Sequence, residues 1–348
     1  MRKVPLVRAA HLNVYLEVLR EQGVPVHKGL DRAGLPTTVD ETPNYYLSVP
    51  KVLDFVSANG GAGAAMELGF AAARSMGLDG LRPQTRTAIL SAPSGLARLQ
   101  AAASRATREN GALIASMVTR GDDLRVVCDI VGYRDSPALA YAEWLQLQAF
   151  ISIVRSVAGP SWCPAEMTFI SKRAPPAAAL ETFPNTRILM GRTHTSIVVP
   201  RVLLGRPCPV DPAAVASALD PPQDRACLAT AEMIREILKT YLRDRPLRIG
   251  ELAEILGTSE RSLQRHLGAE NLKFSTLVAE ARYQVACEML SRGDMSVTDV
   301  AYSTGYENPS HFSRAFRRFT GLSPRQYQCS IHPQPMEPCN IDASSNGR

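Results

Sequence analysis

A short pattern that occurs twice near the C-terminal end constrains this chain more than any other feature. Ala253 and Gly257 recur 48 residues later as Ala301 and Gly305, and each alanine follows an apolar residue. A fixed offset between two similar segments indicates one structural unit built twice. We therefore expect this end of the chain to contain two copies of a small helical unit.

The first copy, residues 249–267, predicts a helix-turn-helix. Two short helices that cross steeply need a small residue at the crossing, here Ala253, and a left-handed turn, here Gly257. Ser259, or else Thr258, can cap the second helix. Apolar residues at helical spacing form the predicted shared core: Leu252, Leu256, Leu263 and Leu267. Three polar residues are left for the outer face: Arg261, Gln264 and Arg265.

The second copy, residues 297–319, has a turn that is one residue longer. Pro309 suits the first position of its second helix, and Asn308 suits the cap. Three aromatic residues are predicted to point inward: Phe312, Phe316 and Phe319. The predicted outer face consists of Ser310, His311, Ser313, Arg314 and Arg317. Residues 309–325 contain four arginines and no acidic residue, so a basic patch is expected here.

The outer faces of both copies suit the major groove of DNA, because Arg pairs with guanine and Gln with adenine. The alternative is a solvated helix whose Arg and Gln only keep it soluble. Between the copies, residues 275–290 predict an amphipathic helix with Leu277, Ala281, Val285 and Met289 four apart. At 1.5 Å per residue it would be roughly 24 Å long. With its flanking turns it could place the two outer faces about one DNA turn, roughly 34 Å, apart.

The remainder of the chain predicts a different kind of domain. Helical periodicity up to residue 109 gives way to β-rich runs at 112–119 and 124–130 around Gly121, then to a helix at 137–157. The predicted fold class is an α+β N-terminal domain followed by an all-α domain with two helix-turn-helix units. We expect an effector-binding and oligomerisation domain at 1–205 and a proline-rich linker at 206–223. The tandem helix-turn-helix domain would span 224–330, and a disordered tail 331–348.

Composition excludes several functional classes. The apolar runs are too short for a membrane-spanning helix, and no secretory leader pattern follows Met1. Seven cysteines without a CxxC pair favour reduced thiols in the cytoplasm, and we expect neither a metal site nor a cofactor. The net charge of +6 permits a polyanionic partner, but residues 223–330 carry only 15 basic against 13 acidic residues. Any DNA contact must therefore depend on local arrangement.

These motifs resemble the AraC/XylS family of transcription regulators over about 224–327, some 30% of the chain. The resemblance rests on the segments 259–265, 299–306 and 312–327, and on the helix between the copies with Ala281, Arg282, Ala286 and Leu290. It implies base contacts from Arg261, Gln264, Arg265, Ser310, Ser313 and Arg314, with Arg282 contacting the DNA backbone. Thr258, where the family usually has an apolar residue, departs from the pattern, and His266 faces either the core or the DNA. Segments 183–188 and 199–207 are similar to the effector-binding domain of the ornithine-utilisation-regulator subgroup, which implies a small organic ligand.

We therefore predict a cytoplasmic, sequence-specific DNA-binding regulator, an activator, and not an enzyme. The expected partners are double-stranded promoter DNA, RNA polymerase and a small-molecule effector, and a homodimer is compatible with them; no membrane is expected. One alternative is a ligand-independent DNA-binding protein with a structural N-terminal domain. Another is an alkylation-repair methyltransferase, which needs a reactive cysteine; Cys128, Cys163, Cys208 and Cys227 are too dispersed for its metal-bound form. A ligand-dependent shift in melting temperature would separate the first alternative from our prediction.

Overall fold

The computed structural model describes residues 4–61, 63–208 and 230–331. The chain forms two compact units, Met1–Leu272 and Lys273–Arg348. This division falls inside the region predicted as one tandem domain, because the first helix-turn-helix groups with the N-terminal part. Most of the predicted linker, its short helix at 213–219 and the predicted tail from 332 lie outside the described residues. The predicted domain bounds therefore stay a prediction.

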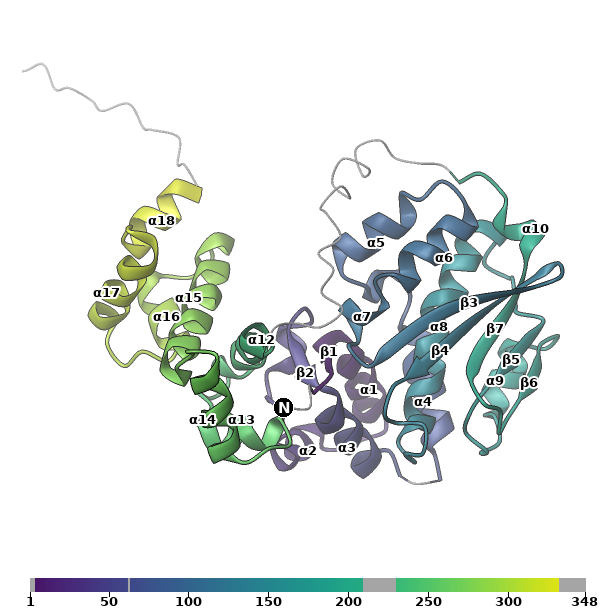
Figure 1. Ribbon diagram of the computed structural model, residues 1–348, viewed down its shortest axis with the longest axis horizontal. Helices are drawn as coiled ribbons and strands as arrows, with labels where there is room; N and C mark the ends of the chain where they lie inside the picture. The colour runs from purple at the N-terminus through teal and green to yellow at the C-terminus, as the bar shows by residue number, and fades with distance from the viewer. Residues whose placement is uncertain (1–3, 62, 209–229, 332–348) are drawn as a thin grey trace, which may run out of the picture. The chain divides into compact units, whose positions relative to one another are not determined.

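A five-stranded sheet organises the N-terminal part of the first unit, in the order β3-β4-β7-β5-β6 (Figure 1). Its strands are β3 (Leu113–Arg120), β4 (Asp123–Ile130), β7 (Thr195–Pro200), β5 (Glu166–Thr168) and β6 (Arg187–Leu189). All neighbours are antiparallel except β5 and β6. The predicted hairpin is confirmed: β3 and β4 pair from Arg120↔Asp123 outward, and Gly121 takes a φ of 57° in the turn.

The helix α8 (Leu139–Ala158) packs against β4 and β7 and forms the centre of the core (Figure 1). Trp144, on its buried side, lies 4.9 Å from Phe70 and 4.5 Å from Phe169 between ring centroids. Glu143 is fully buried in the same helix and accepts hydrogen bonds from the backbone N–H groups of Ile170 and Ser171 and from the Thr195 hydroxyl. Burial raises the pKa of this carboxyl above its usual range, although these hydrogen bonds oppose the shift. Glu143 therefore ties α8 to the strand region, a contact that periodicity alone does not predict.

Further helices surround this core. They are α1 (Ala9–Glu21), α2 (Val26–Ala33), α3 (Val49–Asn59), α4 (Ala65–Ser75), α5 (Pro83–Leu90), α6 (Gly95–Ala103), α7 (Ala106–Glu109), α9 (Ala177–Thr182) and α10 (Arg201–Leu204). The helical region predicted up to residue 109 contains a break between α6 and α7. The break follows Ser104, whose hydroxyl donates to the carbonyl of Ala101 at 3.0 Å and so competes with the helical hydrogen bonds.

A second, two-stranded antiparallel sheet pairs β1 (Leu6–Arg8) with β2 (Tyr46–Ser48). The helix α12 (Thr230–Leu242) packs against β2 within the same compact unit. The hydroxyl of Thr240, which is 1% exposed, donates to the carbonyl of Tyr46 at 2.7 Å. The Tyr241 hydroxyl donates to the carbonyl of Gly34 at 2.8 Å. These buried hydrogen bonds attach the helix before the first helix-turn-helix to the N-terminal part.

The second compact unit contains α15 (Phe274–Arg292), α16 (Val297–Ser303), α17 (Pro309–Thr320) and α18 (Pro324–Ile331). The predicted apolar face of α15 is confirmed, because Leu277, Ala281, Val285 and Met289 are all buried. Phe312 and Phe316 are buried as predicted. Phe319 is not: it is 43% exposed and stacks on Tyr283 at 5.1 Å, so the prediction that it points inward was wrong. It lies in the last turn of α17, where its ring contacts α15 through Tyr283.

Candidate nucleic-acid interface

The first helix-turn-helix consists of α13 (Ile249–Ile255) and α14 (Glu260–Ala269). Ala253 is buried, and Gly257 takes the left-handed conformation that the turn requires, with a φ of 59°. The backbone N–H of Thr258 donates to the carbonyl of Ala253 at 2.9 Å and closes the turn. Ser259 accepts the N–H of Ser262 at 3.2 Å and caps α14, which confirms one of the two predicted caps.

The buried side of α14 determines which residues it exposes. Leu263 and Leu267 are buried, as predicted, and they place the predicted contact residues Arg261, Gln264 and Arg265 on the exposed side. The Gln264 amide donates to the carboxylate of Glu260 at 3.1 Å, which orients that amide along the helix. His266 is half-buried, and its Nδ1 lies 2.6 Å from the carbonyl oxygen of Ser262.

The second helix-turn-helix, α16 and α17, repeats the hydrogen bonds of the first turn at the predicted offset. The N–H of Tyr306 donates to Ala301 at 3.0 Å, the counterpart of the bond between Thr258 and Ala253. Gly305 takes a φ of 78°. The repeat in the sequence is therefore a repeat of turn geometry.

The extra residue in the second turn lies between this turn and α17. Asn308 accepts the N–H of Ser310 at 2.8 Å and caps the helix, and Pro309 takes its first position, as predicted. Four of the predicted contact residues are exposed and the fifth, Ser313, is half-buried; the exposed ones are Ser310, His311, Arg314 and Arg317. The arrangement of side chains is that expected of a recognition helix, while contact with DNA itself stays a prediction for each residue.

Arg282, predicted to contact the DNA backbone, lies against the second turn. Its guanidinium carbon is 5.0 Å from the ring centroid of Tyr306, and its Nε is buried without a hydrogen-bond partner. A Cβ placed on Gly305 would lie 3.3 Å from its Nη2. Arg282 therefore packs on the turn through Tyr306, a contact that was not predicted. The aromatic residue directly after the turn glycine is a signal that could have indicated it.

The two recognition helices differ in charge. α14 contains two arginines and one glutamate, whereas α17 contains three arginines and no acidic residue. A positive helix face attracts the phosphate backbone whatever the base sequence. The predicted basic patch therefore lies on α17, the recognition helix of the second helix-turn-helix. Within the described ranges no group of His, Cys, Asp and Glu is arranged to hold a metal ion, and no helix there is long and apolar enough to cross a membrane.

A family model described as a helix-turn-helix domain matches residues 252–329, the region of this geometry. The HTH-type transcriptional regulator VirS of Mycobacterium tuberculosis is 24% identical over 337 residues, 93% of this chain and 96% of that protein. The ornithine utilization regulator of Pseudomonas aeruginosa is 30% identical over 112 residues, 30% of this chain and 33% of that protein. The chain therefore contains a helix-turn-helix domain and is similar to these transcriptional regulators.

Another relative matches over a shorter part of the chain. An uncharacterised HTH-type transcriptional regulator of Mycobacterium tuberculosis is 27% identical over 161 residues, so the chain spans 44% of that protein's length. Among solved structures, the transcriptional regulator CdpR of Pseudomonas aeruginosa is 19% identical, with a TM-score of 0.42 over 87% of this chain and 96% of that one. The three curated relatives named here are regulators, which agrees with the class of protein predicted from the sequence.

Proposed function

We propose that this AraC-type protein is a sequence-specific transcription activator that acts in the cytoplasm, binds promoter DNA with both recognition helices and responds to a small organic metabolite. The observation that supports it best is the exposure of Arg261, Gln264 and Arg265 on α14 and of Arg314 and Arg317 on α17. Both helices begin with a side-chain cap, so their first turns, where base contacts are usually made, are held in place.

We propose activation because a relative is named as a transcriptional activator. Activation of transcription requires RNA polymerase as a partner. The transcriptional activator NphR of Rhodococcus is 30% identical over 95 residues, 27% of this chain. An activator of this type would recruit RNA polymerase to a promoter beside its own binding site. In vitro transcription from a supercoiled template with and without the protein tests the sign of regulation; a fall in transcript would make it a repressor.

The test of DNA recognition compares variants of the two helices with a matched control. Footprinting of the full chain on its neighbouring intergenic DNA locates the site. Arg265→Ala should then weaken binding there by about 1–3 kcal/mol, roughly 5- to 150-fold, and relax the preference at one base pair. Arg86→Ala removes an exposed arginine of α5 that pairs with Asp79, and should leave DNA affinity unchanged.

Arg317→Ala sharpens this test, because we assign that residue to the phosphate backbone. It should weaken specific and random DNA alike and reduce the slope of log affinity against log salt by about 1. Equal losses on every sequence for both Arg265→Ala and Arg317→Ala would contradict base recognition by α14. No loss for either would contradict the DNA interface itself.

A further inference from the structure

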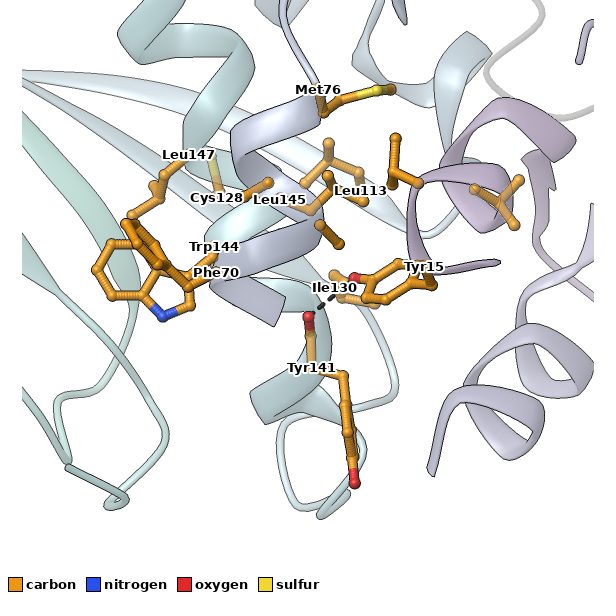
Figure 2. Packing of buried hydrophobic residues seen from close by; sticks show 14 of the residues in the cluster. Tyr15, Phe70, Met76, Leu113, Cys128, Ile130, Tyr141, Trp144, Leu145 and Leu147 are labelled. Atoms are coloured by element: carbon orange, nitrogen blue, oxygen red, sulfur yellow. Dashed lines mark hydrogen bonds between the residues drawn. The ribbon is translucent and has the colours of Figure 1, made fainter. Parts of the chain in front are cut away.

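A cavity of about 90 Å³ lies within the N-terminal part of the Met1–Leu272 unit. Its wall comes from α1, α3, α5, α6, α7 and α8 and from the strands β1, β3 and β4. Most of its lining is apolar, and Figure 2 shows four of these side chains close together: Met76, Leu113, Ile130 and Leu145. Nothing assigned above to DNA binding uses this space.

Two polar side chains in the wall have unmet hydrogen-bonding capacity. Gln146 is 7% exposed, and both its amide nitrogen and its amide oxygen are buried without a partner. His11 also lines the cavity, and its Nδ1 is buried without a partner. A buried polar group without a hydrogen bond costs about 1–3 kcal/mol, so a molecule bound in the cavity that supplied the missing partners would recover this free energy. The amide of Gln146 could both donate to a ligand and accept from it.

Charges around the cavity exclude ionic ligands. Glu109 lines it, but its carboxylate pairs with Arg8 at 2.5 Å, and both side chains are nearly completely buried. Arg8 is further held by the carbonyl of Gly80 and the side chain of Asn44. Burial lowers the pKa of His11 to about 4, with Glu109 opposing and Arg8 supporting the shift, so the ring is neutral. No lysine or arginine is among the described lining residues, so an anionic group would have no counter-charge.

The size of the cavity sets a second limit. A cavity of about 150 Å³ holds benzene, and one water molecule has a share of about 30 Å³ in the liquid. The space beside Gln146 therefore suits a compact body of about six non-hydrogen atoms or fewer, or one compact end of a larger molecule.

We propose that this cavity binds a compact, uncharged molecule whose apolar body packs against the side chains from α3, α5 and α8 and whose amide, carbonyl or hydroxyl group hydrogen-bonds with Gln146. Binding itself is argued from the cavity; its effect on transcription rests on the proposed function. A zwitterionic amino acid does not fit this site, because none of the described lining residues is a lysine or arginine that could pair with its carboxylate.

The segment directly before one wall helix of the cavity is hydrogen-bonded to the first helix-turn-helix. Ligand binding in the cavity can therefore affect DNA binding. Val49 and Leu53 of α3 line the cavity directly after β2. The carbonyl of Tyr46 in β2 accepts the hydroxyl of Thr240 at 2.7 Å, and Ser48 donates to the carbonyl of Ile255 in α13 at 3.4 Å. A ligand that displaces the start of α3 would therefore displace the attachment of α12 and α13.

The binding test uses the full chain and two isosteric probes, isobutyramide and isobutyrate, each followed by titration calorimetry and by thermal melting. Isobutyramide should bind with millimolar affinity and raise the melting temperature, whereas isobutyrate should do neither. Gln146→Leu keeps the volume and removes the amide, and should weaken isobutyramide at least tenfold. Ala149→Leu fills the cavity from another position of α8 and should abolish binding. The proposal is overturned if isobutyramide does not bind, if isobutyrate binds equally well, or if both variants bind isobutyramide like the unchanged chain.

The regulatory test measures DNA affinity with and without isobutyramide. Saturating isobutyramide should change the affinity for the footprinted site, and by linkage that DNA should change the affinity for isobutyramide by the same factor. Thr240→Val, which is close in shape, should retain isobutyramide binding and lose most of this coupling. Binding of isobutyramide without any change in DNA affinity would overturn the regulatory route and the proposed ligand response while leaving the cavity assignment in place. Sequence-specific DNA binding without isobutyramide binding would overturn the cavity assignment alone.

Discussion

The two helix-turn-helix units share a backbone turn and differ in almost everything built around it. In both, a buried alanine accepts the N–H of the residue after a left-handed glycine, at 2.9 Å in the first and 3.0 Å in the second. Around this turn, leucines form the core of the first helix-turn-helix, whereas aromatic rings, Phe312 and Phe316, form the core of the second. The comparison teaches that the crossing of two short helices needs only a small residue and a glycine at fixed positions, so core and surface are free to diverge.

That divergence suggests different contributions to DNA binding. The first helix-turn-helix is attached to the N-terminal part through hydrogen bonds of Thr240 and Ser48. Its recognition helix contains an acidic residue, Glu260. The second belongs to a separate compact unit and carries three arginines on its recognition helix. We therefore expect the first helix-turn-helix to carry the ligand response. The second should supply more of the affinity for DNA that does not depend on base sequence.

The largest expected effect separates the two cores. Phe316→Ala should destabilise the second unit by about 3–5 kcal/mol, because it removes a fully buried ring that contacts Tyr283, Phe312 and Tyr327. Hydrogen exchange measured residue by residue should show lost protection in α15–α18 and unchanged protection in the Met1–Leu272 unit.

Leu263→Ala is the matched substitution in the first helix-turn-helix, because Leu263 is buried in α14 as Phe316 is in α17. It should cost about 2–5 kcal/mol and lower protection in α13 and α14 while leaving α17 protected. If either substitution lowers protection equally throughout the chain, the two units unfold together and the comparison fails.

Acidification should destabilise the Met1–Leu272 unit, which contains His11. The pKa of His11 is lowered by burial to about 4, whereas an exposed histidine titrates near 6.5. The unfolded chain therefore binds a proton here that the folded chain does not, so stability is present above about pH 6.5 and is lost as the pH falls toward 4. Between pH 7 and pH 5 the loss should be about 2 kcal/mol.

Urea unfolding of His11→Gln at both pH values measures this contribution as a difference from the unchanged chain. His27→Gln, an exposed histidine of α2, is the control and should behave like the unchanged chain. Glu143, whose pKa is raised, acts in the opposite direction on acidification, so only the difference between variants is diagnostic. An unchanged pH dependence in His11→Gln would mean that the imidazole is charged or solvated in the folded state.

The part of the fold that the sequence predicted well is the part whose signals are local. Gly257, Asn308 and Pro309 act within a few residues of themselves, so the turns, the caps and the exposed faces of α14 and α17 could be inferred. The cavity could not be inferred, because it is formed by side chains from segments up to 146 positions apart, such as Val7 and Ile153. The attachment of α12 to β2 was missed for the same reason, since a threonine in a helix gives no signal of its distant partner.

The smallest expected effect tests whether Arg282 braces the second turn. Gly257→Ala and Gly305→Ala both place an L-residue at positive φ, which costs about 1–2 kcal/mol. The added methyl of Gly257→Ala would have no atom within 4 Å, whereas that of Gly305→Ala would lie 3.3 Å from Nη2 of Arg282. Gly305→Ala should therefore cost a further few tenths of a kcal/mol, because Arg282 must shift on the ring of Tyr306. Hydrogen exchange of α13 and α16 amides measures each loss, and the Gly305→Ala, Arg282→Ala double variant should show a coupling that the Gly257→Ala, Arg282→Ala pair does not. Equal losses for the two glycines, with no coupling to Arg282, would mean that Arg282 leaves the turn free and is available to the DNA backbone instead.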